Sequence, residues 1–175
     1  MSNLNVGRPD ASEYPPYAEK YVNLVEGSDV LPALAKQLEE TIALLKPGDD
    51  RRASEFSYAP GKWTLKQVLG HVIDTERIFG YRMLCFARND SNPLPGFEQD
   101  DYVASGSFNE RPLSSLLAEF RAVRISTIAL LQNLPQQAWS RHGIANKHRV
   151  TVRGLAFLAA GHALHHVKIL REKYL

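Results

Sequence analysis

Residues 152–171 read VRGLAFLAAGHALHHVKILR, and Thr151 stands before them as an N-cap candidate. At about 100° per residue, a stripe roughly 80° wide on this helix contains Leu155, Ala159, His162, His166 and Ile169. Such a stripe is the buried side of an amphipathic helix. Two imidazoles are therefore expected to point into a helical core.

Three further runs repeat apolar residues at three- and four-residue steps, which predicts three more amphipathic helices. They cover residues 29–46, 64–88 and 113–134. Asp29 is the N-cap candidate of the first, and Lys46-Pro47-Gly48 is expected to end it. Thr64 with Gln67 forms a capping box at the start of the second. Four such helices predict an all-α four-helix bundle over residues 29–175.

The segments around these helices differ in character. Residues 1–28 hold prolines and tyrosines without a clear period, and we expect an extended arm that wraps the bundle. Residues 49–62 are polar and contain a Pro-Gly pair, which predicts a loop. Residues 89–112 form an unusually long connection, expected to cover an active site. Residues 142–151 are expected to hold a short hairpin.

Composition describes an ordinary globular domain. The chain has 175 residues, 44% of them hydrophobic and 23% charged, which suits one domain with one core. Its 21 basic and 19 acidic residues leave a net charge of +2, too little for a nucleic-acid-binding surface. No segment approaches the roughly 18 apolar residues of a membrane span, so neither nucleic acid nor membrane is an expected partner.

The chain contains a single cysteine, Cys85. One cysteine cannot form an intramolecular disulfide, and no secretory signal pattern opens the chain, so we expect a cytoplasmic protein. Within the second helix, Cys85 is expected to be a small buried residue and not a nucleophile.

The histidine spacing on the last helix indicates a metal site. His162 and His166 stand one turn apart, so both imidazoles can bind one cation, whereas His165 lies about 60° to one side and is the weaker candidate. Burying two imidazoles without partners costs about a few kcal/mol, and a shared metal removes that cost. The competing interpretation is a pair of core histidines with other hydrogen-bond partners.

A third ligand would have to come from another helix. His71 is the histidine placed deep inside one, but it sits roughly 100° from the apolar centre of its helix, at the edge of the stripe. Helical periodicity alone therefore leaves its role open. His142 and His148 fall in the predicted hairpin and are expected to be solvated.

Six segments together resemble one family. Three of them, PGKWT (60–64), QVLGHVID (67–74) and GHALHH (161–166), are similar to the DinB/YfiT-like superfamily. Three more, PGFEQDDY (95–102), LLAEFRAVR (116–124) and TVRGL (151–155), are similar to its YfiT branch. The resemblance covers most of residues 30–172, and the order and separation of the segments make it specific.

This resemblance implies a bundle with up-down-down-up topology and a divalent metal held by three histidines. Carried over by position, these are His71, His162 and His166. It also implies frequent homodimers. Relatives include enzymes that use low-molecular-weight thiols such as bacillithiol or mycothiol, and others described as metal-dependent hydrolases. One departure is Val167, because many relatives have arginine after the paired histidines, so a role for that arginine does not transfer.

Three neutral histidines leave coordination positions of a divalent ion open to substrate, the arrangement of catalytic sites. A thiol bound to such an ion loses its proton, and bound water falls to a pKa of about 7. Zinc and nickel both suit imidazole ligands. The first hypothesis is a transferase in which the metal activates a small thiol cofactor for attack on a small electrophilic substrate.

Two alternatives stay open. The first is a metal-dependent hydrolase, in which Asp74, one turn after His71, is a weak candidate for the general base. The second is a non-catalytic metal- or ligand-binding module. Arg82 and Arg88 are candidates to attract an anionic cofactor, although ordinary surface arginines would explain them equally well. Trp63 is expected to act as a hydrophobic staple at the start of the second helix.

Overall fold

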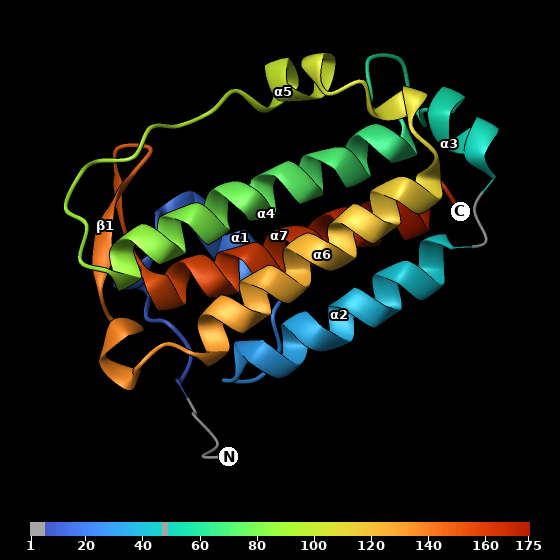
Figure 1. Ribbon diagram of the computed structural model, residues 1–175. Helices are drawn as coiled ribbons and strands as arrows, with labels where there is room; N and C mark the ends of the chain where they lie inside the picture. The colour runs from blue at the N-terminus through green and yellow to red at the C-terminus, as the bar shows by residue number, and fades with distance from the viewer. Residues whose placement is uncertain (1–5, 47–48) are drawn as a thin grey trace.

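The computed structural model describes residues 6–46 and 49–175. Four long helices form a bundle: α2 (Val30–Leu45), α4 (Leu65–Ala87), α6 (Leu113–Gln132) and α7 (Val152–Lys173). In Figure 1, α2 and α7 run in one direction while α4 and α6 run in the other, which is up-down-down-up order. The predicted all-α bundle and its topology are confirmed.

Side chains cap the helices where the sequence predicted. The Thr64 hydroxyl accepts from the Gln67 amide at 3.2 Å, and the Gln67 side chain accepts from the Thr64 amide at 2.9 Å. The Asp29 side chain caps α2 by accepting from the Leu31 amide, and the Thr151 side chain caps α7 by accepting from the Gly154 amide. Helix α2 ends at Leu45 with Lys46 as its C-cap, and the predicted Pro47-Gly48 stop lies outside the described residues.

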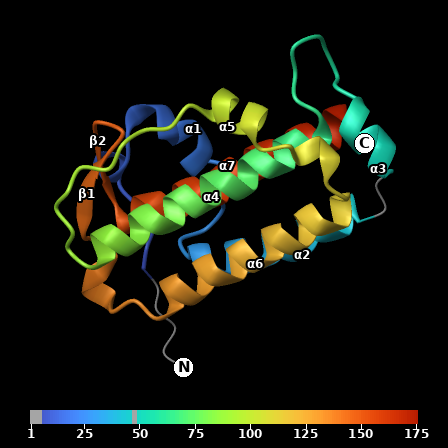
Figure 2. The ribbon, with the colours of Figure 1, turned by 45° about the horizontal axis from the view of Figure 1, so that its top comes forward.

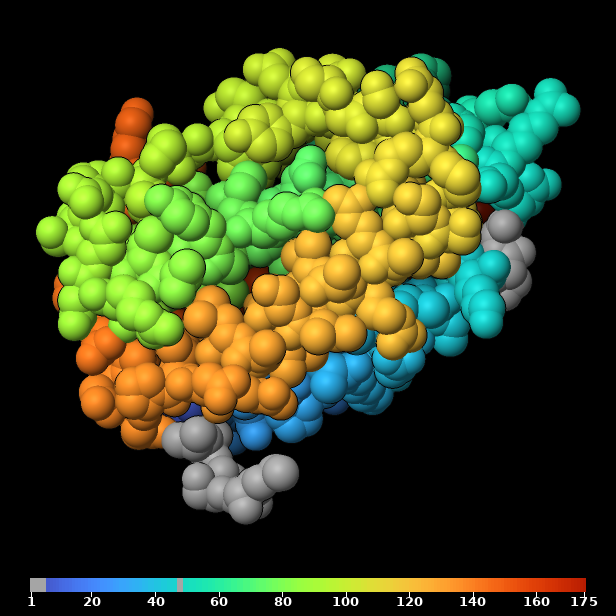
Figure 3. Space-filling model, viewed as in Figure 1, coloured from blue at the N-terminus to red at the C-terminus, as the bar shows by residue number. Residues whose placement is uncertain are grey.

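Because α4 and α6 are parallel, the chain between them must cross the whole length of the bundle. This connection contains α5 (Gln99–Ser105) and a 3-10 helix (Phe108–Glu110). Figure 3 shows it as a yellow-green ridge over α4. At its start, the Leu94 amide donates to the carbonyl of Ile144 at 2.9 Å, which fastens the connection to the hairpin.

The predicted hairpin is present. Strands β1 (His142–Ala145) and β2 (His148–Thr151) pair antiparallel. Their turn residues, Asn146 and Lys147, have φ angles of 48° and 66°. Positive φ at both central positions matches the twist of a two-residue hairpin turn. His142 and His148 are exposed, as predicted.

The prediction of a loop throughout residues 49–62 is wrong, because the segment contains α3 (Asp50–Glu55). The Asp49 side chain caps this helix by accepting from the amides of Arg51 and Arg52. This helix of 6 residues buries only Ala53. Its sequence therefore shows no repeat of apolar residues from which a helix could be predicted.

The N-terminal segment wraps the bundle, but as short helical turns and not as a fully extended arm. It contains two 3-10 helices (Ala11–Glu13 and Pro16–Ala18) and α1 (Glu19–Val22), which packs on α7. Figure 2 shows α1 and α5 on the same face of the bundle, over α4 and α7. A division of the chain into units at residue 28 stays a prediction.

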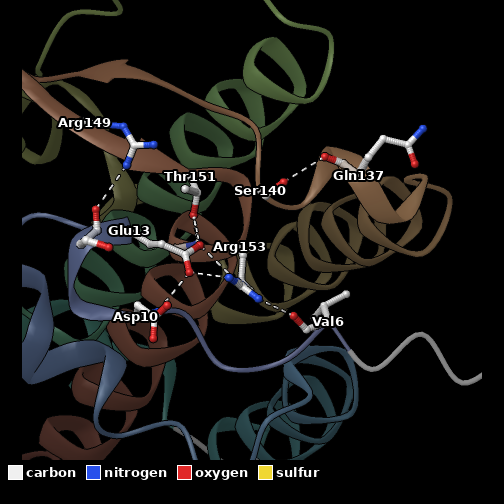
Figure 4. A network of polar contacts seen from close by, with 10 residues as sticks. Val6, Asp10, Glu13, Gln137, Ser140, Arg149, Thr151 and Arg153 are labelled. Carbon is white, nitrogen blue, oxygen red and sulfur yellow. Dashed lines mark hydrogen bonds and ion pairs between the residues drawn. The ribbon is translucent and has the colours of Figure 1, made fainter.

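Glu13 fastens the segment to the bundle. Its carboxylate, buried near α7, accepts from the Thr151 hydroxyl at 2.8 Å and from the Arg153 guanidinium, which also donates to the carbonyl of Val6 at 2.7 Å (Figure 4). Burial alone would raise the pKa of Glu13, but the hydrogen bonds from Arg153, the Asp10 backbone and Thr151 together lower it. This network places α1 beside the histidines of α7.

Gly161 allows α1 to approach α7 closely. A Cβ at this position would lie 2.0 Å from the backbone oxygen of Tyr21. Gly161→Ala is therefore expected to lower the free energy of unfolding by about 2 kcal/mol, because a backbone atom cannot rotate away. Urea unfolding measures this change. Gly80→Ala on α4 is the control, since its Cβ would meet its nearest neighbour at 3.9 Å, and equal stability of the two variants would contradict the expectation.

An ion pair joins three helices inside the bundle. Arg124 on α6 is 0% exposed, and its guanidinium donates to the two carboxylate oxygens of Glu76 on α4 at 2.7 and 2.8 Å. Its remaining nitrogen donates to the Gln37 side chain on α2 at 3.0 Å. Cys85 is buried with a free thiol, as predicted. Within the described residues, no helix is long and apolar enough to cross a membrane.

Candidate metal centre

Helices α4 and α7 bring three imidazoles together. His162 Nε2 lies 3.1 Å from His71 Nε2 and 3.1 Å from His166 Nε2. One ring nitrogen from each residue lies within 4.8 Å of the others. His71 is 3% exposed and His162 is 9% exposed. The three residues that the resemblance marks as ligands thus form one cluster.

The orientation of His71 follows from the place of α4 in the bundle. This helix packs against α7 on one side and against α6 on the other. It therefore has two buried faces, and a residue at the edge of its apolar stripe points inward. Glu76 uses the face toward α6, whereas His71 uses the face toward α7.

The convergence of three Nε2 atoms fits a divalent cation better than a hydrogen-bonded group. A neutral imidazole nitrogen offers one proton or one lone pair, so His162 Nε2 cannot make two good hydrogen bonds at once. Tetrahedral zinc with nitrogen ligands at about 2.0–2.1 Å would separate those nitrogens by about 3.3 Å. The 3.1 Å separations are close to that value.

The three histidines are neutral at pH 7. Burial lowers the pKa of His71 to about 4, although the nearby Asp100 carboxylate opposes the change. Burial and the neighbouring imidazoles lower the pKa of His166 to about 3 and hold that of His162 well below its ordinary value. Lone pairs are therefore available for a metal without prior deprotonation.

The lowered pKa values predict an acid-sensitive metal-free protein. Below the ordinary pKa of 6.5 the unfolded chain binds protons at these histidines, while the folded protein does not until about pH 4 at His71. The free energy of unfolding should therefore fall as pH drops from about 6.5 toward 4, by up to about 1.4 kcal/mol per pH unit for each histidine.

Urea unfolding of chelator-treated protein at pH 7, 6 and 5 measures this dependence. His162→Phe should make the fall shallower, because one buried imidazole is gone. His142→Gln should leave it unchanged, because that ring is exposed. A flat dependence in the wild-type protein would contradict the expectation.

Thr75 supports the orientation of His71. Its hydroxyl lies 3.4 Å from His71 Nδ1, one turn along α4. If Nδ1–H donates to this hydroxyl, the lone pair of Nε2 faces His162. The ring of Trp63, the expected staple of α4, lies with its centre 4.9 Å from that of His71. The ring of Tyr21 from α1 lies 5.7 Å from His162.

Thr75→Val is expected to weaken binding of a divalent metal by about tenfold, since it removes the hydroxyl while keeping the side-chain shape. Competition with a chelator of known affinity measures the change. Thr127→Val on α6 is the matched control, because its buried hydroxyl donates to the carbonyl of Val123 and not to a histidine. Equal metal affinity of the two variants would exclude a supporting role for Thr75.

The cluster opens into a cavity of about 380 Å³. Helix α4 lines it with His71, Thr75, Phe79 and Arg82, and α7 adds His162. The other walls come from the N-terminal segment, the connection and the hairpin: Tyr17, Lys20, Tyr21, Gly96–Asp100 and Asn146. A second hollow on the far side of the cluster is lined by His166, Trp63 and Asp100. The connection that was expected to cover an active site thus lines both.

The structure does not bring Asp74 to this cavity. Its carboxylate lies 3.7 Å from the Arg77 guanidinium. The charges of Glu119 and Arg111 also affect its pKa. Burial raises the pKa of Asp74, with Arg77 opposing. The cavity is lined instead by Glu98 and Asp100. A general base predicted from spacing along α4 alone is therefore misplaced.

The remaining candidates separate clearly. Arg82 is buried and lines the cavity, whereas Arg88 is exposed and lies outside it. The ring of His165 packs 5.3 Å from that of Tyr21 and stands outside the group of three, as its position on the helix indicated. Asp100 was missed by sequence reasoning, although it lies in the quoted PGFEQDDY segment.

The fold and the cluster together define a helical-bundle protein with three converging histidines beside an open cavity. A family model supports this class over most of the chain. The chain belongs to the DinB superfamily, whose model matches residues 23–170.

Two solved structures share the fold. One is YfiT from Bacillus subtilis, described as a probable metal-dependent hydrolase with an unusual four-helix bundle topology, with a TM-score of 0.69 and 19% identity over 94% of this chain and 89% of that one. The other is a mycothiol-dependent maleylpyruvate isomerase, with a TM-score of 0.67 and 14% identity over 79% of this chain and 58% of that one. No curated protein matches the sequence.

Proposed function

We propose that His71, His162 and His166 hold a divalent metal ion and that the protein is a metal-dependent enzyme acting on small molecules. The observation that carries this proposal is the convergence of three neutral, largely buried imidazoles beside an open cavity, in which His162 Nε2 lies 3.1 Å from Nε2 of His71 and of His166. A histidine-only ligand set leaves positions for a substrate, as catalytic sites do.

The reaction that we propose is transfer of a small thiol such as bacillithiol to an electrophilic carbon. When bound, a divalent ion lowers the pKa of a thiol so that its sulfur is nucleophilic near neutral pH. Asp100 accepts the thiol proton, because its carboxylate lines the cavity and lies near enough to His71 to act on its pKa. The sulfur–carbon bond forms while the leaving group departs with its electron pair.

Surrounding residues prepare the cluster for this reaction. Thr75 orients His71, and the rings of Trp63, Tyr21 and Phe79 pack around the imidazoles. The described similarity to a mycothiol-dependent enzyme supports the thiol. The similarity to YfiT supports the alternative, a hydrolase in which Asp100 takes the proton from water instead.

One experiment separates these functions. Protein loaded with one equivalent of Co²⁺ is mixed with bacillithiol, mycothiol or cysteine, and the thiolate-to-cobalt charge-transfer band is recorded. A band, together with thiol-dependent consumption of monochlorobimane, supports the transferase. Ester or amide cleavage without a thiol supports the hydrolase. Absence of both thiol binding and thiol consumption overturns the transferase.

A non-catalytic metal clip predicts something different. A clip should melt the bundle when a chelator removes the metal, whereas an open catalytic site should leave it folded. The second outcome is expected, because apolar residues from all four helices form the core. Circular dichroism before and after chelation measures this.

We also propose that the metal is zinc or nickel, that the protein forms a homodimer and that it is located in the cytoplasm. The all-histidine ligand set supports either metal. The family resemblance supports the homodimer, and the single free thiol of Cys85 suits a reducing compartment.

A further inference from the structure

Arg82 carries a buried positive charge into the cavity. The residue is 6% exposed, and one of its nitrogens donates to the carbonyl of Pro95 at 2.7 Å. Over residues 6–46 and 49–175, no carboxylate oxygen lies within 4.0 Å of its guanidinium nitrogens. A buried charge without an ionic partner is unfavourable unless a ligand supplies one.

Two other arginines that join elements of the bundle have carboxylate partners, whereas Arg8 and Arg141, which are less buried than Arg82, donate to backbone carbonyls. Arg124 pairs with Glu76, and Arg153 pairs with Glu13. Both pairs join elements of the bundle and leave their guanidinium charge neutralised. Arg82 is the exception among these three, and it is also the one that lines the cavity.

The position of Arg82 defines how far its ligand must extend. Its guanidinium carbon lies 6.0 Å from the ring centre of Phe79, which lies 6.1 Å from the ring centre of His162. These two steps place the guanidinium at most about 12 Å from the His162 ring. Arg82 and Phe79 line the cavity from α4 together with His71, so the path from the guanidinium to the histidine cluster runs along the cavity.

Lys20 provides a second cation on the opposite wall. Its ammonium lies 4.9 Å from the ring centre of Tyr21, which lies 5.7 Å from that of His162. The carboxylate of Asp100 stands at the other end, because it also lines the hollow beside His166 and Trp63. Glu98 also lines the cavity, and because Lys20, Glu98 and Asp100 are all exposed, solvent screens the charge of each, unlike that of the buried Arg82.

We propose that Arg82, with Lys20, binds the carboxylate of an elongated small substrate or thiol cofactor whose reacting group meets the three histidines. This inference rests on the proposed function and names the class of molecule that the cavity accepts. A planar guanidinium with free N–H donors matches a carboxylate, and a cavity of about 380 Å³ is large enough for a small organic acid.

The test compares two thiols of equal length on zinc-loaded protein by calorimetry: 6-mercaptohexanoate and the neutral 6-mercaptohexan-1-ol. Wild-type protein should bind the carboxylate about tenfold more tightly or better, as a charge-assisted contact predicts. Arg82→Gln should remove this preference, and Arg82→Lys should restore part of it. Arg88→Gln, which changes the exposed arginine at the C-cap of the same helix, should keep it in full. Equal binding of both thiols by the wild type overturns the inference.

A second measurement separates this inference from the metal proposal. If neither thiol binds, the thiol–metal proposal fails, and chelator-treated protein is then melted with adipate, a dicarboxylate without a thiol. A rise in Tm for the wild type and for Arg88→Gln, absent in Arg82→Gln, supports the carboxylate site on its own. No rise in the wild type overturns it.

Discussion

His162→Ala is expected to abolish stoichiometric binding of a divalent metal. His162 Nε2 is the central atom of the cluster, at 3.1 Å from both partner nitrogens, and it is contributed from deep within α7. Loss of a residue that merely orients a ligand weakens metal binding by about 10–100-fold, so loss of a ligand should exceed that range. Elemental analysis of protein reconstituted with zinc or nickel measures the change.

His165→Ala is the matched control for this substitution. It removes an imidazole from the same helix, three residues away, but one whose ring packs on Tyr21 outside the group of three. The wild type and His165→Ala should each hold about one equivalent of metal, and His162→Ala should hold almost none while its helical spectrum is retained. Metal retained equally by both variants would show that binding does not depend on His162 and would contradict the three-histidine site.

Local patterns predicted most of the fold. Capping residues such as Thr64 and Thr151 act through neighbours three positions away, so they can be recognised without knowledge of the tertiary structure. The short helix α3 was not predicted, because its Asp49 cap and its Arg51–Glu55 ion pair stabilise a helix that has no apolar stripe. Hydrophobic periodicity does not predict a helix that buries so few residues.

The site was predictable only in part, for a geometric reason. His162 and His166 share one helix, so their spacing alone places them together. His71 lies on a helix with two buried faces, where periodicity cannot say which face a residue near the edge will join. Asp100 reaches the cavity from a connection that crosses the bundle, and no local pattern in the sequence shows where such a crossing will lie.

The second large effect is expected far from the metal cluster, at Glu76. Glu76→Gln is expected to lower the free energy of unfolding by about 3–5 kcal/mol, the range for breaking a buried ion pair. Glu76 is 3% exposed, and its two oxygens accept from an Arg124 side chain that is 0% exposed. The amide keeps one acceptor but removes the negative charge, which leaves a guanidinium charge in the core of three helices.

Urea unfolding compares this variant with Glu39→Gln, which breaks the pair between Glu39 on α2 and Arg121 on α6. That pair is also held by two contacts, each of 3.2 Å, but its side chains are 65% and 45% exposed, so water and salt replace the lost charge. The Glu39 variant should therefore lose only a small fraction of the stability that the Glu76 variant loses. Similar losses in the two variants would show that burial does not determine the contribution of these ion pairs.

A double variant, Glu76→Leu with Arg124→Met, separates the cost of an unpaired charge from the contribution of the pair. Apolar side chains of similar length remove both charges together, and such replacements are often neutral or stabilising. The double variant should therefore be more stable than Glu76→Gln alone, even though it lacks every contact of the original pair. Because these residues use the face of α4 away from His71, both variants should still bind one equivalent of metal when folded.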